Sequence, residues 1–188
     1  MAVVTAKWTI EDYHRMIAAG ILANRQVELL NGEIIEMAPE GTPHAAYSQE
    51  AGDYLRSILG RRAKVREAKP ITLLNSASEP EPDIAIVALH PIEVYLQHHP
   101  YPDDIFWLIE FSDSSLSKDL EEKSRIYAAA GIREYWVINL RIMKLIVFRS
   151  PVDGNYQSSI TLETGTIAPL AFPDLSISID RLLGRSTG

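Results

Sequence analysis

The sequence predicts a mixed α/β (α+β) fold in which helices flank a central sheet. Residues 83–89 (DIAIVAL) and 105–111 (IFWLIEF) are short, continuous apolar runs, which are typical of strands buried on both faces. Amphipathic helical segments precede and follow these runs, at residues 43–60 and 116–130. The composition, 46% hydrophobic and 23% charged residues over 188 positions, is that of one globular domain, and no repeat or linker divides it.

A helix and a β-hairpin are predicted over residues 9–37. Thr9 and Asp12 have the spacing of a capping box, which favours the start of a helix. The segment VELLNGEIIEM is centred on Asn31-Gly32, and this dipeptide readily supplies the two positive φ angles of a type I′ turn. We therefore expect two short antiparallel strands after the first helix.

The core of the fold is predicted over residues 43–140. Pro43 suits the first turn of a helix that ends at Gly60. Two strands are expected next, at 64–69 and 71–74, before the proline-broken loop NSASEPEP. The remaining elements are the two apolar strands, the helix over 116–130 and a strand over 134–140.

Residues 142–183 are expected to extend the sheet with C-terminal strands. The segment 143–149 (MKLIVFR) predicts a hairpin with 134–140, and 156–163 (YQSSITLE) alternates as an edge strand does. The tail 174–184 (DLSISIDRLLG) predicts a short strand and a turn.

Composition and missing motifs exclude several classes of function. The chain has no cysteine, so disulfides, thiolate metal sites and cysteine nucleophiles are excluded, and its five histidines show no metal-ligand spacing. The motifs GxGxxG, GxxxxGKS/T, GxSxG and HExxH are absent. The formal net charge of −7 counts against tight, nonspecific nucleic-acid binding. Because no signal-peptide pattern or membrane-length apolar run is visible, we expect a cytoplasmic protein without membrane contact.

Two carboxylates lie within the apolar runs, where a charge is costly. Asp83 begins the first run, and Glu110 stands near the end of the second between two apolar residues. Carboxylates that converge from neighbouring strands form an oxygen-rich site suited to Mg²⁺ or Mn²⁺. The alternative is that Asp83 only caps its strand and that Glu110 points to solvent at a sheet edge.

Lys123 occupies a position on the third predicted helix where an apolar residue is expected. The inward-facing stripe of this helix consists of Leu116, Leu120, Lys123, Tyr127 and Ala130. The ammonium group can reach over the sheet toward Glu110 and complete a cluster of two carboxylates and one lysine. The alternative is a lysine that extends to the surface and pairs with Asp119 or Glu122.

Four segments connect the chain with a known family: PEPDIAIV, LIEFSDSS, SKDLEEKSRIYAAAGIREYWVINL and VELLNGEIIEMAPEGTPH. They resemble a bacterial family of restriction-endonuclease-like proteins, catalogued as a domain of unknown function within the PD-(D/E)xK nuclease superfamily. The similarity spans nearly the whole chain. It implies an αβββαβ core, which coincides with the elements predicted over residues 43–140, and a nucleic acid, in particular DNA, as substrate.

The resemblance implies positions for the superfamily motif. Asp83 takes the place of the aspartate in PD, and Glu110 takes the place of the acid in (D/E)xK. Ser112 stands where the superfamily has its lysine. Lys123 matches the helix position to which this family is thought to move that lysine, and the helical periodicity singles out the same residue.

The implied activity is divalent-metal-dependent hydrolysis of phosphodiester bonds. One or two Mg²⁺ (or Mn²⁺) ions would be held by three groups: Asp83, Glu110 and the Phe111 carbonyl. Lys123 would orient the attacking water or stabilise developing negative charge. Glu28 and His44 also match family positions, and they are further candidate residues of the site.

Two other functions stay open. The fold could serve as a catalytically inactive interaction or scaffold module. The absence of the ExK lysine and the net negative charge of the chain favour this alternative. It could also hydrolyse a small phosphorylated substrate, which needs no long basic groove. The discriminating feature is whether basic residues flank the carboxylates; the two groups are Arg61, Arg62, Lys64, Arg66 and Lys69, and Arg141, Lys144 and Arg149. An edge strand at 156–163 is also compatible with a homodimer.

Overall fold

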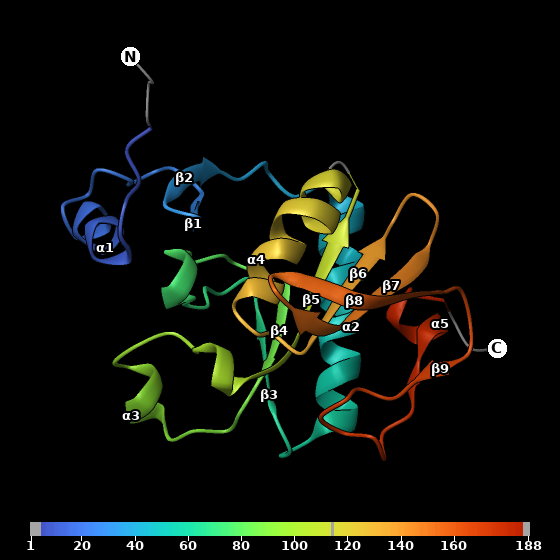
Figure 1. Ribbon diagram of the computed structural model, residues 1–188. Helices are drawn as coiled ribbons and strands as arrows, with labels where there is room; N and C mark the ends of the chain where they lie inside the picture. Colours follow the sequence, from blue (N-terminus) through green and yellow to red (C-terminus); the bar gives the residue numbers. More distant parts are fainter. Residues whose placement is uncertain (1–4, 114, 186–188) are drawn as a thin grey trace.

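The computed structural model describes residues 5–113 and 115–185, and its centre is a six-stranded mixed sheet (Figure 1). In order across the sheet, the strands are β3 (Lys64–Glu67), β4 (Ile84–Val87), β5 (Ile105–Ser112), β6 (Glu134–Asn139), β7 (Lys144–Val152) and β8 (Asn155–Leu162). Strands β5 and β6 are parallel, and the other neighbouring pairs are antiparallel. The alternating segment predicted as an edge strand is β8, at one end of the sheet.

One face of the sheet is covered by α2 (Thr42–Leu59), with the short α5 (Ile179–Leu182) beside it (Figure 1). Leu55 of α2 is buried in one cluster with Trp107 and Trp136, which project from β5 and β6. Burying large aromatic and aliphatic side chains in this way is the main source of favourable folding free energy. The predicted helix from Pro43 to Gly60 is therefore confirmed.

The opposite face is covered by one helical rod that consists of η3 (Lys118–Lys123), a π-helical segment, and α4 (Ser124–Ala129). Tyr127 of this rod belongs to a second buried cluster together with Leu108 of β5. The elements α2, β3, β4, β5, α4 and β6 follow one another in the order αβββαβ. This is the core that the sequence predicts, with helices on both faces of a mixed sheet.

The N-terminal helix and hairpin form as predicted and lie at one side of the sheet (Figure 1). Their elements are α1 (Ile10–Ala18), β1 (Val27–Leu30) and β2 (Glu33–Glu36). Asn31 and Gly32 have φ angles of 48° and 73°, as a type I′ turn requires. Backbone hydrogen bonds between Leu29 and Glu79 attach β1 to the loop that leads into β4.

Replacing Thr9 by alanine is expected to lower the free energy of unfolding by about 1 kcal/mol. The Thr9 hydroxyl accepts a hydrogen bond from the Asp12 amide at 3.1 Å, and the Asp12 carboxylate accepts one from the Thr9 amide at 3.3 Å. Urea unfolding of Thr9→Ala and Thr9→Ser measures the effect. The serine variant keeps the hydroxyl and should stay close to the wild type; an equal loss in both variants would contradict the capping explanation.

Residues 71–74 do not form the strand that the sequence predicts. Ala68 has a φ angle of 43°, which turns the chain away from the sheet directly after β3. The amide of Ile71 then donates to the Pro80 carbonyl of the neighbouring loop, and η1 (Leu74–Ser76) follows as a single 3₁₀ turn. The amides of residues 71–73 therefore donate to carbonyls of loops rather than of the sheet.

The C-terminal segment differs from its prediction in one detail. The strand is confirmed as β10 (Ile177–Ser178), which pairs with β9 (Thr166–Ile167), but the predicted turn is the short helix α5. The remaining elements are α3 (Ile92–Tyr95) and η2 (Pro102–Asp104). Among the residues that the structure describes, none of the helices has both the length and the apolar character that crossing a membrane requires.

Candidate active site

Asp83 and Glu110 come together because β4 and β5 pair in antiparallel register. Ile84 lies opposite Ile109, so Asp83, one position before β4, lies next to Glu110. The Asp83 carboxylate accepts a hydrogen bond from the Phe111 amide at 2.6 Å. It is therefore the Phe111 N–H group that faces this carboxylate, and this bond holds the start of β4 against the end of β5.

Glu110 lies in the interior of the sheet and not at a solvent-facing edge. Its residue exposure is 3%, and β5 is flanked by β4 and β6. One carboxylate oxygen, Oε1, accepts hydrogen bonds from Lys123 Nζ at 2.9 Å and from the Tyr127 hydroxyl at 2.8 Å. The alternative in which Glu110 points to solvent is therefore wrong.

Burial governs the electrostatics of this pair. It raises the pKa of Glu110 to about 8, and the nearby Lys123 ammonium group opposes that rise. Burial alone would lower the pKa of Lys123, but the surrounding carboxylates, Glu110 foremost and Glu28 next, outweigh it and raise this pKa instead. The raised pKa favours the ammonium form of Lys123 among these buried acids.

Lys123 reaches Glu110 from the helical rod on the α4 side, as the apolar stripe predicts. The alternative partner, Asp119, is not the one used: its carboxylate accepts hydrogen bonds from Ser112 and Ser115, both at 2.6 Å. Ser112 stands where the superfamily motif has a lysine, and here its hydroxyl fixes the start of the helical rod instead. Lys123 places an ammonium group 2.9 Å from Glu110 Oε1, from the helix position that the resemblance implies for this lysine.

Glu28 enters the same cluster from the N-terminal hairpin. It is 1% exposed, and its carboxylate lies 2.7 Å from Lys118 Nζ and 3.6 Å from Lys123 Nζ. Burial alone would raise the pKa of Glu28, but these two ammonium groups outweigh it and lower this pKa. The structure thus brings Glu28, Asp83, Glu110 and Lys123 into one site.

Lys118 is a residue of the site that the sequence reasoning missed. In a π-helix the hydrogen bonds connect residues five apart, so Lys118 and Lys123 lie one above the other. Both side chains reach Glu28 for this reason. If the segment were an α-helix, the two lysines would lie on different faces. The only sequence signal is the unusual density of charged residues in the segment SKDLEEK.

His44 lies at the start of α2 and contacts Asp83. Its Nε2 is 3.0 Å from the Asp83 carboxylate, and its Nδ1 is 3.7 Å from the carboxylate of Glu40. The hydrogen bond with Asp83 raises the pKa of His44. A cavity of about 260 Å³ beside this pair is lined by Glu40, Asp83 and Glu67, among others.

The groups around Asp83 fit a divalent cation. Glu40, His44 and Asp83 each offer a ligand atom, and these atoms lie within 4.8 Å of one another. Carboxylates with one imidazole are ligands that Mn²⁺ and similar ions accept, and carboxylates alone suit Mg²⁺. Glu40 is a candidate that the sequence reasoning missed, and His44 adds a nitrogen donor to the oxygen ligands expected from the sequence.

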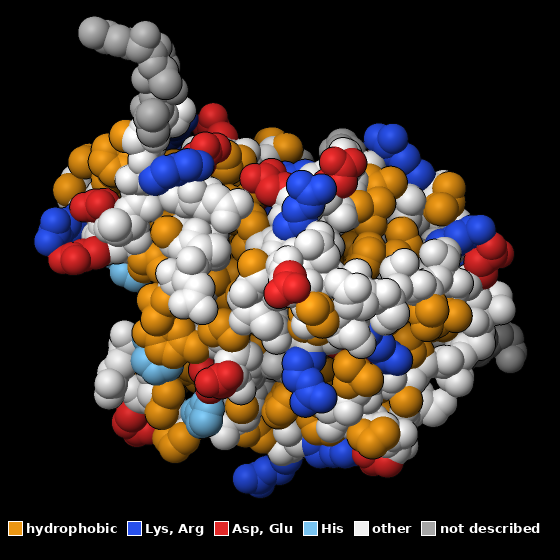
Figure 2. All heavy atoms as spheres, viewed as in Figure 1, with side chains coloured by type: hydrophobic (Ala, Val, Ile, Leu, Met, Phe, Trp, Pro, Cys, Tyr) orange, Lys and Arg blue, Asp and Glu red, His pale blue; other side chains and the backbone are white. Residues whose placement is uncertain are grey.

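The basic run of residues 61–69 lies only partly beside the carboxylates. Lys64 pairs with Val87, at the end of β4 away from Asp83, whereas Lys69 follows Ala68, whose amide donates to the Asp83 carbonyl at 3.0 Å. Arg62 forms an ion pair with Asp174. The second group is also occupied, with ion pairs from Arg141, Lys144 and Arg149 to Asp113, Glu163 and Glu134. Figure 2 shows Lys and Arg side chains dispersed among acidic and apolar ones on this face of the molecule.

Comparisons with known proteins agree with this fold. No curated protein matches the chain. A similar solved structure is titled a putative nuclease belonging to DUF820 from Anabaena variabilis ATCC 29413; it is 17% identical, with a TM-score of 0.70 over 94% of this chain and 97% of that one. The family model Uma2, described as "Putative restriction endonuclease", matches residues 10–180. The chain therefore belongs to the Uma2 family of restriction-endonuclease-like proteins.

Proposed function

We propose that the protein is a divalent-metal-dependent endonuclease that hydrolyses phosphodiester bonds in nucleic acid, in particular DNA. The observation that carries the proposal is the convergence of three acids, Glu28, Asp83 and Glu110, with the buried Lys123. These groups come from the hairpin, two adjacent strands and the helical rod. A buried set of like charges around one cation is a costly arrangement, and such arrangements concentrate at functional sites.

Mg²⁺ or Mn²⁺ would be held by Asp83 and Glu110, with the Phe111 carbonyl as a further oxygen ligand. His44 contacts Asp83 Oδ2, the oxygen that also accepts from the Phe111 amide, and together with Glu40 it can fix the orientation of Asp83 or add a ligand. When bound, the ion would polarise the phosphate and lower the pKa of the attacking water.

The chain's own residues supply positioning and charge. Tyr127 and Lys123 both donate to Glu110 Oε1, which leaves Oε2 of this carboxylate without either of these donors. The Lys123 ammonium group is held at the bottom of the site, where it can orient water or stabilise negative charge on the phosphate. Lys118 is more exposed than Lys123, so it is placed to meet a phosphate that approaches from solvent.

A small phosphorylated substrate is the second candidate. The observation in its favour is that Lys64 lies at the end of β4 away from Asp83 and that Arg62, which precedes β3, is occupied by an ion pair with Asp174. A short substrate needs only the cations at the site itself, such as Lys118 and Lys123. The two functions differ in whether a polynucleotide is cut internally.

Asp83→Asn is expected to lower metal-dependent cleavage at least about a hundredfold, because the amide is a poor ligand for a hard cation. The assay incubates protein with supercoiled plasmid, single-stranded DNA or RNA in Mg²⁺, Mn²⁺ or EDTA. The matched control is Asp153→Asn, an exposed aspartate in the β7–β8 turn, which should keep full activity.

Cleavage that persists in EDTA, or an Asp83→Asn variant as active as the control, would overturn the proposal. Hydrolysis of a phosphate ester such as bis(p-nitrophenyl) phosphate without cleavage of any polynucleotide would support the small-substrate function. Folded protein that neither binds Mg²⁺ or Mn²⁺ at millimolar concentration nor cleaves any of these substrates would indicate a scaffold.

A further inference from the structure

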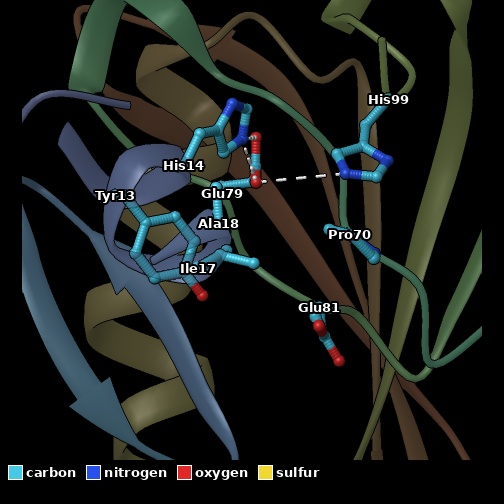
Figure 3. Close-up of a pocket in the computed structure, with 8 residues that line it drawn as sticks. All are labelled: Tyr13, His14, Ile17, Ala18, Pro70, Glu79, Glu81 and His99. Carbon is cyan, nitrogen blue, oxygen red and sulfur yellow. Dashed lines mark hydrogen bonds and ion pairs between the residues drawn. The ribbon is translucent and has the colours of Figure 1, made fainter. Parts of the chain in front are cut away.

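A second cluster of metal-ligating side chains lies between α1 and the loops that precede β4 and β5. It lines a cavity of about 260 Å³, whose walls include Tyr13, His14, Glu79 and His99 (Figure 3). Neither histidine takes part in the candidate active site. Glu79 is 3% exposed, so a carboxylate is buried at the wall of a cavity that solvent can enter.

Two imidazole rings face this carboxylate from different segments of the chain. His14 Nε2 lies 2.8 Å from Glu79 Oε1 and 3.0 Å from Oε2, and His99 Nε2 lies 4.0 Å from Oε1. Figure 3 shows the two rings on opposite sides of the carboxylate. Because the histidines are 85 positions apart in the chain, their sequence spacing gives no sign of this arrangement.

A further contact fixes the carboxylate. The Thr72 hydroxyl donates to Glu79 Oε2 at 2.8 Å, so Oε1 is the oxygen left between the two rings. The backbone of Glu79 is held as well, because its amide donates to the Leu29 carbonyl at 2.7 Å. A carboxylate that is oriented by a hydroxyl and faces two imidazoles has the ligands and the supporting hydrogen bond of a transition-metal site.

We propose that His14, Glu79 and His99 bind one first-row divalent metal ion of the Zn²⁺ class. This site is separate from the oxygen-rich one at Asp83. Two imidazoles and one carboxylate are a common ligand set of Zn²⁺, with water in the fourth position.

Binding requires the two imidazole rings to converge on one side of Glu79 Oε1, because they lie on opposite sides of the carboxylate (Figure 3). Each ligand atom would then lie about 2.0–2.2 Å from Zn²⁺. The two rings can make this adjustment, since their side chains are 50% and 38% exposed and are not held by core packing. The acidic surroundings also favour a cation, because Glu81 lines the same cavity.

A metal at this position would connect the N-terminal unit with the core. His14 belongs to α1, whereas Glu79 and His99 belong to the loops before β4 and β5. Glu79 is bonded to Leu29, the neighbour of Glu28 in β1. Metal binding would therefore stabilise the hairpin that delivers Glu28 to the candidate active site, without itself touching substrate.

The test uses full-length protein without an affinity tag, stripped with EDTA and titrated with Zn²⁺ by calorimetry and with Co²⁺ by visible absorption. We expect at least one equivalent to bind to the wild type and one equivalent to remain in Asp83→Asn, whose substitution removes a ligand of the other candidate metal site. His14→Ala and His99→Ala should each weaken binding at least tenfold, whereas His90→Ala, which removes a histidine paired with Asp104, should not. Zn²⁺ should raise the melting temperature of the wild type but of neither cluster variant.

The results of the zinc-binding test can be distinguished from those of the cleavage assay for the proposed endonuclease. Folded wild type that binds no Zn²⁺ at micromolar concentration would overturn the site and would leave His14 and Glu79 as a hydrogen-bonded pair only. Binding that both cluster variants retain, or that Asp83→Asn abolishes, would overturn it as well. Zinc binding that depends on both histidines supports the site whether or not the protein cleaves nucleic acid.

Discussion

Lys123→Ala is expected to lower the free energy of unfolding by about 3–5 kcal/mol, since it removes one partner of a buried ion pair. Lys123 Nζ lies 2.9 Å from Glu110 Oε1 and 3.6 Å from Glu28 Oε2. Removing the cation leaves the buried carboxylates of Glu28 and Glu110 without their shared partner, and Lys118 pairs only with Glu28. Urea unfolding of the metal-free protein at pH 9, above the raised pKa of about 8 at which Glu110 becomes a carboxylate, measures the loss.

Two further variants separate the buried charge from side-chain packing. Lys123→Met combined with Glu110→Gln removes both charges at similar volume and should recover much of the stability that Lys123→Ala loses. Lys7→Ala breaks an exposed pair with Glu33 and should cost less than about 1 kcal/mol. A loss in Lys123→Ala no larger than that in Lys7→Ala would contradict the buried ion pair.

Elements with strong local signals could be predicted from the sequence. The turn at Asn31-Gly32 needs two positive φ angles, and the dipeptide that adopts them most readily marks the hairpin without reference to the rest of the chain. Likewise, the continuous apolar runs identify β4 and β5 because strands buried on both faces admit few polar residues.

Elements that depend on the tertiary surroundings could not be predicted. Residues 71–74 have the composition of a strand, but a positive φ at Ala68 directs them into a loop whose carbonyls accept their hydrogen bonds. The π-helical winding of η3 has no recognised local signature, and it decides that Lys118 joins Lys123 at Glu28.

The residues of the candidate site also fall into two groups, those that the sequence indicates and those that only the fold reveals. Lys123 could be found because a charge interrupts an otherwise apolar helical stripe, and Glu110 because it interrupts an apolar strand. The pairing of His44 with Asp83 and the contribution of Glu40 depend on how α2 packs against the sheet. Contacts between segments far apart in sequence cannot be read from one chain without its fold.

The stability of the metal-free protein is expected to fall as the pH rises from about 5 to about 8, relative to Glu110→Gln. Burial raises the pKa of Glu110 in the folded state to about 8, above its usual value of 4.5. Between these values the folded state keeps a proton that the unfolded state has released. The free energy of unfolding therefore falls with pH, by at most about 1.4 kcal/mol per pH unit for one group. Below the usual value both states are protonated, and above about 8 the loss is complete.

Urea unfolding in EDTA at pH 5, 6, 7 and 8 tests this, and the difference between wild type and Glu110→Gln isolates the one carboxyl group from every other titration. Lys123→Met provides a second check, because losing the ammonium group should raise the pKa of Glu110 further and carry the decline above pH 8. A difference that instead grows in favour of the wild type with rising pH would mean that the folded state favours the charged carboxylate. In that case the ion pair with Lys123, and not burial, would dominate the site.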